Sequence, residues 1–543
     1  MKHLPSVKNM MYFALLLGAV ALSIFLHAYW WDALCLNEDE AAQGYNTYSV
    51  LTTGYDEYGR IPLRFLSFGE NKLPLTGMLS SLFIALLGLG DVAVRLPVLI
   101  LGALMPLFFY GAVYTFTKSR LTGIFAALFA STNMWLLTMS RHQHEAVILV
   151  VIVLLIVRRI YQKHHEDVDV IRFVLGMGAL LFMGLYSYHS AKVVVPILAG
   201  FWIMQFRTQK KYLRYAVAGV FIAFSLFALT ELIQPNNRVA NLSYFTSPVF
   251  IHEIEEGRRT GGSPLYYNKL VFGVHKLFER SAHYISPSFL LLDSDPNPRY
   301  GSPQVALLTL VEYVLAGVGL IVMWFRKQPW RYLLTALLVA GVLPAALALP
   351  EGSSTRSFVI IVPLLTSASI ALYELTRLMH TRKFVVRMVI IGSMVCIAGA
   401  HVFQFATASY QYFTNYLRSP ATAAAWQCGA KEMAEYVWTR YDDFKHIHIT
   451  NAYGQPYIFL LFYGSYPPAW YQKEARVDAY NEYGFWEHSG FDKFVFEKPL
   501  QVSNTSDTLF IMTPDEAVSN NLDATQLRPI YDKNRFLRYY ASE

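Results

Sequence analysis

The sequence predicts a mainly α-helical membrane protein, a bundle of about eleven spanning helices with a long first outer loop and a small C-terminal α/β domain. Hydrophobic residues make up 54% of the 543 residues and charged residues only 15%, whereas soluble domains carry about 25% charged residues. Aromatic residues account for 15%, and Trp and Tyr favour membrane–water interfaces. This composition places the chain among membrane proteins with several spans.

Membrane spans are predicted wherever about 20 mostly apolar residues, enough to cross a bilayer, follow one another. The first stretch is too long for a signal peptide and has no small-residue cleavage site, so we interpret it as a membrane helix. The predicted spans are residues 10–30, 97–117, 121–139, 146–160, 173–188, 190–206, 215–233, 305–324, 332–349, 357–376 and 388–408.

Short loops rich in Lys and Arg predict the orientation of these spans, because such loops stay in the cytoplasm. They all reach one side only if a further apolar stretch, 75–90, does not cross, so we expect an interfacial helix there. The N-terminus is then cytoplasmic, and the protein is a multi-pass protein of the cell membrane. This use of basic residues accounts for the net charge of +7 without a nucleic-acid partner. The basic loops are Lys2 with Lys8, Lys118 with Arg120, 158–163, 206–214, 325–331 and 381–387.

Two domains follow from this topology. Residues 1–408 form the predicted membrane domain, with long outer loops at 31–96 and 234–304. Residues 409–543 are more polar and contain "HIHIT", "TLFIM" and "FLRYY", which are typical of strands, and a helical stretch at 422–440. We expect this tail to be an α/β domain outside the cytoplasm. The sequence shows no internal repeat, which disfavours a transporter built from inverted repeats.

The first outer loop begins with "LNEDEAAQGYN" (36–46), which places Asp39 and Glu40 just beyond the first span. A carboxylate at that depth is costly unless it has a partner or a role. The loop is also too long for a simple connection. For Asp56 and Glu57, farther along it, we expect a solvated loop whose acids pair with its own bases.

Basic side chains recur at the predicted outer ends of the spans. A phosphate on a lipid carrier needs such cations to hold it and to stabilise its charge as a leaving group. A nearby carboxylate can take the proton of an acceptor hydroxyl. The pattern fits a reaction on a lipid-linked anion but does not identify which reaction it is. The basic residues are Lys72 in the first loop, Arg141 in "SRHQHEAV" (140–147), Lys192 in "YSYHSAK" (186–192) and Arg356 in "PEGSSTRSF" (350–358). The segment of Arg141 also contains an acid, Glu145, in the first turn of the next span.

Histidine and cysteine give little evidence of a metal site. His142 and His144 form only a weak metal pattern, and we favour an interfacial role for both. Cys35, Cys396 and Cys428 lack the spacing of a cysteine zinc site. The first and last of these could both lie outside the membrane, but spacing alone cannot show proximity, so we expect them to be unpaired.

From "DEAAQG" (39–44) onward, the sequence resembles the GT-C fold glycosyltransferases that use polyprenyl-phosphate sugars. More narrowly, it resembles a bacterial branch of the protein O-mannosyltransferase and aminoarabinose transferase group, glycosyltransferase family 39. The first-loop segments "TGYDEYGRIPLRF" and "GENKLPL", followed by "VRLP" (94–97), carry this resemblance, as do "SRHQHEA" and "ISPSFLLLDSDPNPRYG" (285–301). It covers essentially the whole chain.

The resemblance implies a role for each matching acid. Asp39 matches the catalytic acid and would act as general base toward the acceptor hydroxyl, and Glu40 matches its partner, which positions the loop. Glu145 matches a second outer acid. Glu70 is displaced by one residue from an acid that holds a metal in some relatives, because Asn71 intervenes. A divalent metal is therefore an open question, and no other cofactor is expected.

The resemblance also implies the reaction. Lys72 matches a lysine expected at the donor phosphate, and Arg356, Arg141 and Lys192 are further candidates to bind it. The implied function is transfer of a hexose from a polyprenyl-phosphate donor to a hydroxyl of a protein, lipid or glycan, by one inverting displacement. A flippase of lipid-linked sugars and an envelope scaffold remain open alternatives. The sequence names neither the sugar nor the carrier length.

Overall fold

The computed structural model describes residues 7–162, 170–235, 242–302, 305–379, 383–480, 486–498, 500–502 and 507–542. Lys2 and parts of the predicted loops 158–163, 234–304 and 381–387 lie outside these ranges. The chain divides into two compact units. The helical unit comprises Met1–Trp30, Val98–Ile233 and Asn237–Tyr416, and the mixed unit comprises Trp31–Pro97, Gln234–Asn236 and Leu417–Glu543.

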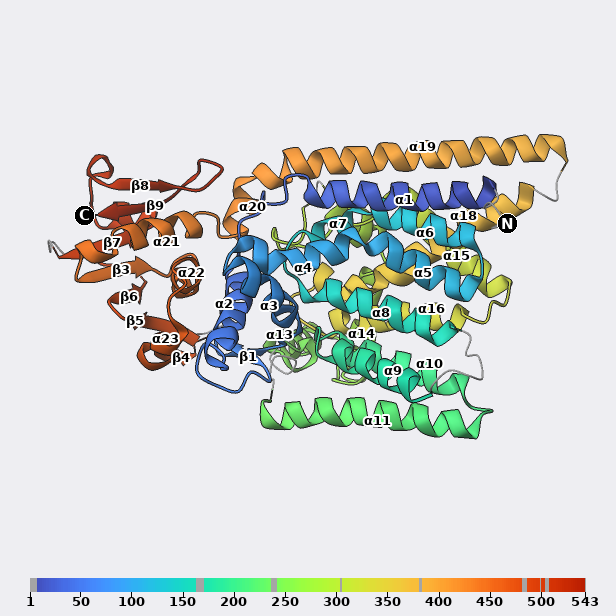
Figure 1. The fold of residues 1–543 in the computed structure, drawn as a ribbon, viewed down its shortest axis with the longest axis horizontal. Coiled ribbons are helices and arrows are strands. Elements are labelled where there is room, and N and C mark those ends of the chain that lie inside the picture. Colours follow the sequence, from blue (N-terminus) through green and yellow to red (C-terminus); the bar gives the residue numbers. More distant parts are fainter. Residues whose placement is uncertain are drawn as a thin grey trace, which may run out of the picture. The chain divides into compact units, whose positions relative to one another are not determined.

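Long apolar helices form the helical unit, and Figure 1 shows α1, α11 and α19 running in one common direction. Inside the unit α15 packs on α18, α5 on α6 and α9 on α11. The helices are α1 (Val7–Ala28), α4 (Asp91–Ala103, which starts in the mixed unit), α5 (Met105–Thr117), α6 (Arg120–Thr132), α7 (Met134–Ser140), α8 (Glu145–Tyr161), α9 (Val170–Leu185), α10 (Ala191–Gln205), α11 (Lys210–Ile233), α15 (Leu310–Phe325), α16 (Arg331–Ala346), α17 (Ser354–Ser357), α18 (Ile361–Met379) and α19 (Phe384–Thr414).

The predicted number of eleven spans is not confirmed. Among the described residues, five helices are long and apolar enough to cross a membrane, or six if the bent pair α6–α7 counts as one. The bend of 58° in that pair falls at Asn133, whose extended backbone ends α6 and whose side chain caps α7 by accepting from Leu136 N–H. Several other predicted spans are helices of only 13 to 17 residues. The chain is nevertheless a helical membrane protein.

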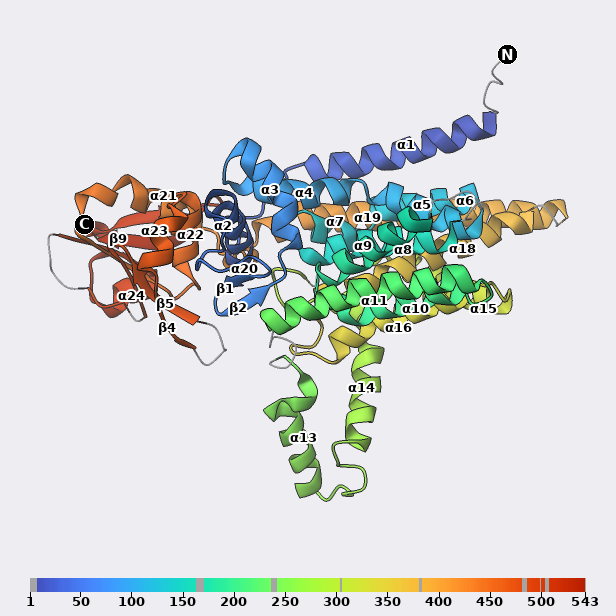
Figure 2. The ribbon, with the colours of Figure 1, turned by 60° about the horizontal axis from the view of Figure 1, so that its bottom comes forward.

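A hairpin of two amphipathic helices, α13 (Pro248–Arg259) and α14 (Val271–His283), belongs to the helical unit. Figure 2 shows these two helices side by side and transverse to α11 and α16. Two short helical segments, η1 (Tyr244–Thr246) and η2 (Ser288–Asp293), flank the hairpin.

A seven-stranded sheet organises the mixed unit, in the order β4-β5-β6-β3-β7-β9-β8. Strand β3 is parallel to β6 and β7, and the other pairs are antiparallel. The predicted strands at "HIHIT", "TLFIM" and "FLRYY" are β3, β7 and β9. The bounds are β3 (His446–Thr450), β4 (Arg476–Tyr480), β5 (Trp486–Phe491), β6 (Phe494–Glu497), β7 (Thr508–Met512), β8 (Arg528–Tyr531) and β9 (Leu537–Ser542).

Helices of the tail pack on this sheet. The predicted helix at 422–440 is broken into α20 (Pro420–Ala425) and α21 (Ala430–Thr439). Trp426 is the C-cap of α20, and Gly429 is the N-cap of α21 with a positive φ of 99°, which glycine adopts readily. Beyond β3 follow α22 (Pro456–Tyr463) and α23 (Pro468–Glu474), and α24 (Pro514–Ser519) follows β7.

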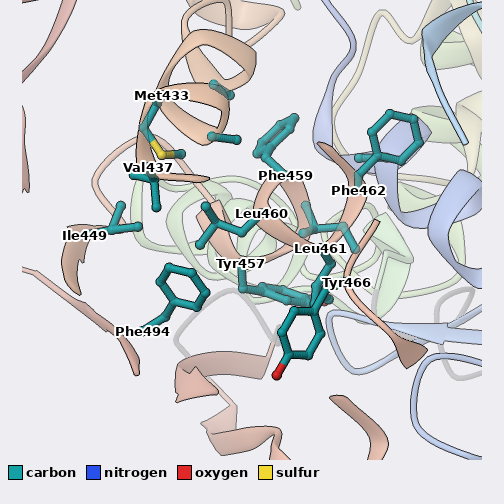
Figure 3. Packing of buried hydrophobic residues seen from close by; sticks show 14 of the residues in the cluster. Met433, Val437, Ile449, Tyr457, Phe459, Leu460, Leu461, Phe462, Tyr466 and Phe494 are labelled. Atoms are coloured by element: carbon teal, nitrogen blue, oxygen red, sulfur yellow. The ribbon is translucent and has the colours of Figure 1, made fainter. Parts of the chain in front are cut away.

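The first outer loop shares one hydrophobic core with this tail. The loop forms α2 (Glu38–Thr53), the hairpin β1 (Phe65–Ser67) and β2 (Glu70–Lys72), and α3 (Leu75–Leu87), the last within the stretch predicted to be interfacial. Its side chains Ala41, Tyr45 and Phe68 belong to the same buried cluster as α21, α22 and the sheet. Figure 3 shows part of that cluster, with Val437 of α21 and Leu460 of α22. A Cβ on Gly44 of α2 would lie 2.6 Å from the ring of Phe462, so glycine allows α2 and α22 to pack closely.

A disulfide contradicts the expectation that the cysteines are unpaired. Cys35 and Cys428 are 393 residues apart in sequence and are covalently joined, with Cα atoms 5.3 Å apart. The packing of the first loop onto the tail brings them together, which sequence spacing could not show.

Candidate active site

The N-terminus of α2 fixes the two acids of the "DEAAQG" motif. The side-chain oxygen of Asn37 accepts hydrogen bonds from the backbone N–H groups of Asp39 (2.9 Å) and Glu40 (3.2 Å), and the Glu40 carboxylate accepts from Asn37 N–H (3.3 Å). This reciprocal capping box satisfies N–H groups that a helix start leaves unpaired. Carboxylates in the first turn are further stabilised by the helix dipole.

Asp39 forms an ion pair with Lys72, as a carboxylate oxygen 2.5 Å from Nζ. Lys72 ends the hairpin β1–β2, whose turn is formed by Phe68 and Gly69 with positive φ angles of 55° and 79°. Its ammonium lies 4.6 Å from the ring centre of Phe68. The Lys72 side chain is 6% exposed and that of Asp39 is 53% exposed. Solvent therefore reaches the Asp39 carboxylate, whereas the Lys72 ammonium behind it is buried.

Glu40 forms a second ion pair that is buried on both sides. Its carboxylate binds the Arg95 guanidinium through two hydrogen bonds, of 2.7 Å to Nε and 2.6 Å to Nη2. Arg95 also donates to the carbonyls of Leu34 and Cys35, both at 2.7 Å. Both charged side chains are 1% exposed. The Glu40–Arg95 pair thus links α2 to α4 and to the segment that precedes α2, which supports a positioning role for Glu40.

The expectation of a solvated loop at Asp56 and Glu57 is wrong, because both side chains are fully buried. The expected pairing with a base of the same loop is confirmed for Asp56, which pairs with Arg60. Asp56 accepts hydrogen bonds from the backbone N–H groups of Tyr58 (3.0 Å) and Arg60 (2.8 Å), with the Arg60 side chain 3.9 Å away. Burial nevertheless raises the pKa of Asp56. The loop folds inward against α23, whose Gln472 donates to the Asp56 carbonyl at 2.9 Å.

Glu57 is a buried acid close to Lys72, and the sequence did not identify it as a residue of this region. It accepts hydrogen bonds from Asn46 (2.8 Å) and from the hydroxyl of Tyr457 (3.1 Å). Burial, and then the neighbouring charge of Asp56, raise the pKa of Glu57 to about 8, although the Lys72 ammonium opposes the shift. Lys72 therefore interacts with two acids, the half-exposed Asp39 and the buried Glu57. No simple sequence signal distinguishes Glu57 from a solvated loop acid.

Glu70 was the predicted metal candidate. It lies on β2 two residues before Lys72, and alternate residues of a strand point to the same face. Within the described ranges, no group of three or more His, Cys, Asp or Glu side chains is arranged to hold a metal ion. The described residues thus form no metal-ligand set around Glu70.

Arg141 contacts the end of a helix in the helical unit. Its guanidinium donates to the carbonyls of Leu26 (2.7 Å) and Tyr29 (2.8 Å) and to that of Trp30, and the side chain is 1% exposed. These carbonyls lie at and just beyond the C-terminus of α1, where a helix leaves its last acceptors unpaired. The contacts support a structural role for Arg141 more directly than a phosphate-binding role.

The other predicted residues of the helical unit, Lys192, Arg356 and Glu145, lie in the first turns of α10, α17 and α8. Lys192 pairs with Glu231 of α11 at 2.8 Å, and Arg356 donates to the Leu349 carbonyl at 2.6 Å. Glu145 starts α8, next to the N-cap His144. In the same region the Tyr188 hydroxyl donates to Thr355 (3.3 Å), and the backbone N–H of Ser354 donates to Asp295 (2.6 Å). The rings of His142 and His144 both pack against Tyr300, at centroid distances of 5.7 and 5.5 Å.

Of the residues that sequence reasoning missed, Arg95 had a signal. It belongs to "VRLP", the segment that carried part of the family resemblance, and an arginine next to apolar residues requires a partner. Asp295, whose pKa is raised by burial although Arg356 opposes the shift, lies in another matched segment. Neither could be paired with its partner from sequence alone.

Comparisons with known proteins establish the fold only. No protein-family model matches the chain, and no curated protein matches its sequence. The apo oligosaccharyltransferase of Archaeoglobus fulgidus superimposes with a TM-score of 0.50 at 12% identity, over 85% of this chain and 64% of that chain. This chain thus spans less than two thirds of that protein's length.

Two further solved structures resemble the chain more weakly. ArnT of Cupriavidus metallidurans bound to undecaprenyl phosphate has a TM-score of 0.45 at 12% identity, over 99% of this chain and 98% of ArnT. The arabinofuranosyltransferase AftD from Mycobacteria has a TM-score of 0.45 at 13% identity, over 82% of this chain and 30% of AftD. The superposition on the oligosaccharyltransferase carries the conclusion that this chain has the GT-C fold that the sequence predicted.

Proposed function

We propose that this chain is a membrane glycosyltransferase that moves a sugar from a polyprenyl-phosphate donor to an acceptor hydroxyl. One observation carries the proposal: a half-exposed aspartate, Asp39, is held by a buried lysine at the N-terminus of α2. The surrounding GT-C fold is the fold of enzymes with this type of chemistry. Function cannot be read from a fold alone, so the side chains of the site carry the argument.

The proposed chemistry is a single displacement with inversion. The acceptor oxygen forms a bond to the anomeric carbon while the bond from that carbon to the phosphate oxygen breaks, and Asp39 takes the hydroxyl proton. Lys72 holds Asp39 in place through the ion pair of 2.5 Å between its ammonium and the carboxylate. Polyprenyl phosphate leaves with the bonding electrons, and a cation such as Lys72 stabilises its charge.

The remaining predicted residues take supporting roles. Glu40 is a positioning residue, because its carboxylate is fully engaged with Arg95 and is buried. Arg141 and Lys192 hold α1 and α11 through the contacts described above. Glu145 is proposed as the second outer acid. No step is assigned to a metal.

The reaction is proposed on the outer face of the cell membrane. The disulfide between Cys35 and Cys428 favours an oxidising compartment for the mixed unit. In the helical unit, the basic turns at 118–120, 206–210 and 326–331 lie at the helix ends opposite the turns at 141–144, 187–190 and 347–353. Basic turns stay in the cytoplasm, which favours an outer position for the turns that hold Arg141 and Tyr188 and for the turn that precedes Arg356.

Transfer by the purified protein tests this function. The chain is reconstituted in lipid vesicles with a panel of polyprenyl-phosphate sugars and with protein, lipid and glycan acceptors, and mass spectrometry measures the mass added to each acceptor. We expect one donor to give a hexose-sized or pentose-sized shift. Asp39→Asn should reduce the rate by about 10²- to 10⁴-fold, the usual contribution of a general base.

Asp442→Asn is the matched control, because Asp442 is an exposed aspartate of the tail outside the proposed site. It should transfer sugar at the rate of the wild type. Near-normal turnover by Asp39→Asn would remove Asp39 from the mechanism. Movement of intact donor across the vesicle membrane, without any acceptor mass shift, would favour the flippase instead.

A further inference from the structure

The hairpin of α13 and α14 is a folded body with its own core. The rings of Phe250 on α13 and Phe272 on α14 are buried and stack with centroids 5.9 Å apart. Lys276 of α14 forms an ion pair with Glu253 of α13 at 3.3 Å. The two helices therefore hold a fixed orientation to each other, with one face of α14 packed against α13.

The base of the hairpin is anchored to the end of α16. The Arg280 guanidinium of α14 donates to the carbonyls of Ala346 (2.7 Å) and Ala348 (2.6 Å), and Leu349 N–H donates to the Leu242 carbonyl at 2.8 Å. These bonds join both ends of the hairpin to the bundle. Its transverse direction, visible in Figure 2, is thus set by hydrogen bonds to the end of a membrane helix.

The face of α14 opposite its packed face is apolar and exposed. Val271, Val274 and Phe278 follow one another at helical spacing and are 44%, 48% and 72% exposed. Leu270 and Ile285 extend this row at either end, and both are exposed. These five residues, here called the α14 stripe, would make a continuous apolar surface in water, which soluble surfaces rarely carry without a function.

The α14 stripe faces along the sides of the bundle. In Figure 2, α13 lies on the side of α14 that is away from the length of α10 and α16, so the opposite face of α14 points toward that length. The sides of the bundle are themselves apolar and exposed, as on α15, where Leu310, Val314 and Val318 are 53%, 50% and 44% exposed. A transverse helix at the end of a membrane bundle with this orientation faces the lipid leaflet.

We infer that the α13–α14 hairpin is an in-plane membrane anchor whose α14 stripe inserts between the headgroups and acyl chains of the leaflet at that end of the bundle. Amphipathic helices bind membranes this way. Residues 248–283 carry five Lys or Arg and four Asp or Glu side chains, so attraction to anionic lipid contributes little. The chemistry selects the apolar boundary of any phospholipid, phosphatidylcholine included. This inference does not depend on the proposed function.

Fluorescence of labelled full-length protein in vesicles tests the anchor. In a Cys396→Ala background, which removes the free exposed thiol, Phe278→Cys receives an environment-sensitive fluorophore. The protein is reconstituted in phosphatidylcholine with and without a lipid whose nitroxide quencher lies near the headgroup. We expect emission at shorter wavelength and loss of intensity with the quencher lipid, equally at low and high salt. Glu255→Cys, on an exposed position of α13, should show neither change.

Three outcomes would overturn the anchor. Equal emission and equal quenching at positions 278 and 255 would show that the stripe lies in water. Shielding at 278 without quenching by lipid would show that a protein covers it instead. Quenching that requires anionic lipid and disappears at high salt would replace apolar insertion by electrostatic binding. Val274→Cys provides a second position on the stripe if Phe278→Cys does not give a monodisperse protein.

Discussion

Asp39 and Glu40 are adjacent acids in the first turn of α2, yet their environments are opposite. Asp39 is 53% exposed and pairs with one buried lysine, whereas Glu40 is 1% exposed and grips Arg95 through both oxygens. An acid that must take a proton from a substrate has to reach it. An acid that fixes backbone segments has to be surrounded by donors. Chemistry and architecture are thus divided between two neighbouring residues.

The cations of the helical unit extend this contrast. Arg141 is directed at carbonyls around the C-terminus of α1, and Lys192 at Glu231. Their pattern in the sequence resembled that of Lys72, but their partners differ. A cation with a helix end or a carboxylate to satisfy is a structural element first, even where the sequence places it at the predicted outer face.

Glu40→Gln should have the largest effect on stability. Removing the charge leaves the buried Arg95 guanidinium uncompensated, which costs about 3–5 kcal/mol, so the free energy of unfolding should fall by that amount in a detergent thermal-unfolding assay. Glu435→Gln, at an exposed position of α21, is the control and should leave it unchanged. A Glu40 variant as stable as this control would show that the pair does not hold α2.

Glu57→Gln should change how stability depends on pH. With a folded pKa of about 8 against an ordinary value of 4.5, the folded state keeps a proton that the unfolded chain has lost between these pH values. Stability therefore falls as pH rises from about 4.5 to about 8. The substitution should remove most of this fall, a few kcal/mol, and leave a smaller slope from Asp56. An unchanged slope in the unfolding free energy would mean that Glu57 is ionised in the folded protein.

Lys72→Met should reduce transfer with little loss of stability, because it frees a carboxylate that is already half exposed. We expect kcat/KM to fall about a hundredfold, or about 2.7 kcal/mol of transition-state stabilisation, with partial recovery in Lys72→Arg. A fall in kcat alone assigns Lys72 to orienting Asp39, and a rise in donor KM assigns it to the phosphate. Unchanged kinetics would separate the lysine from the reaction.

Arg141→Lys should have the smallest effect. A lysine can satisfy only part of the α1 carbonyls, so unfolding should become easier by about 1 kcal/mol while the donor KM stays constant. Lys192→Gln provides the comparison at the other structural cation. A large rise in donor KM with unchanged unfolding would instead make Arg141 a phosphate ligand.

The sequence predicted the fold class well, because its signals are local, whereas the catalytic role of Asp39 stays a prediction. Apolar stretches mark membrane helices, "HIHIT" alternates as a strand does, and "TLFIM" is a short apolar run typical of a buried strand. The number of spans was harder, since Asn133 bends one helix and several spans are short. The burial of Glu57 was missed because a loop acid has no periodicity that reports its surroundings.

What the sequence determined by itself is the chemistry that is available: a carboxylate just beyond a membrane span, followed by a lysine in the same loop. What only the tertiary structure decided is which charges meet. Lys72 reaches Asp39 through a hairpin turn, Arg95 reaches Glu40 from the next helix but one, and Cys35 reaches Cys428 across 393 residues. The physical reason is that ion pairs and disulfides depend on distances of a few ångströms in space, which packing of the first loop on the tail sets and residue spacing does not.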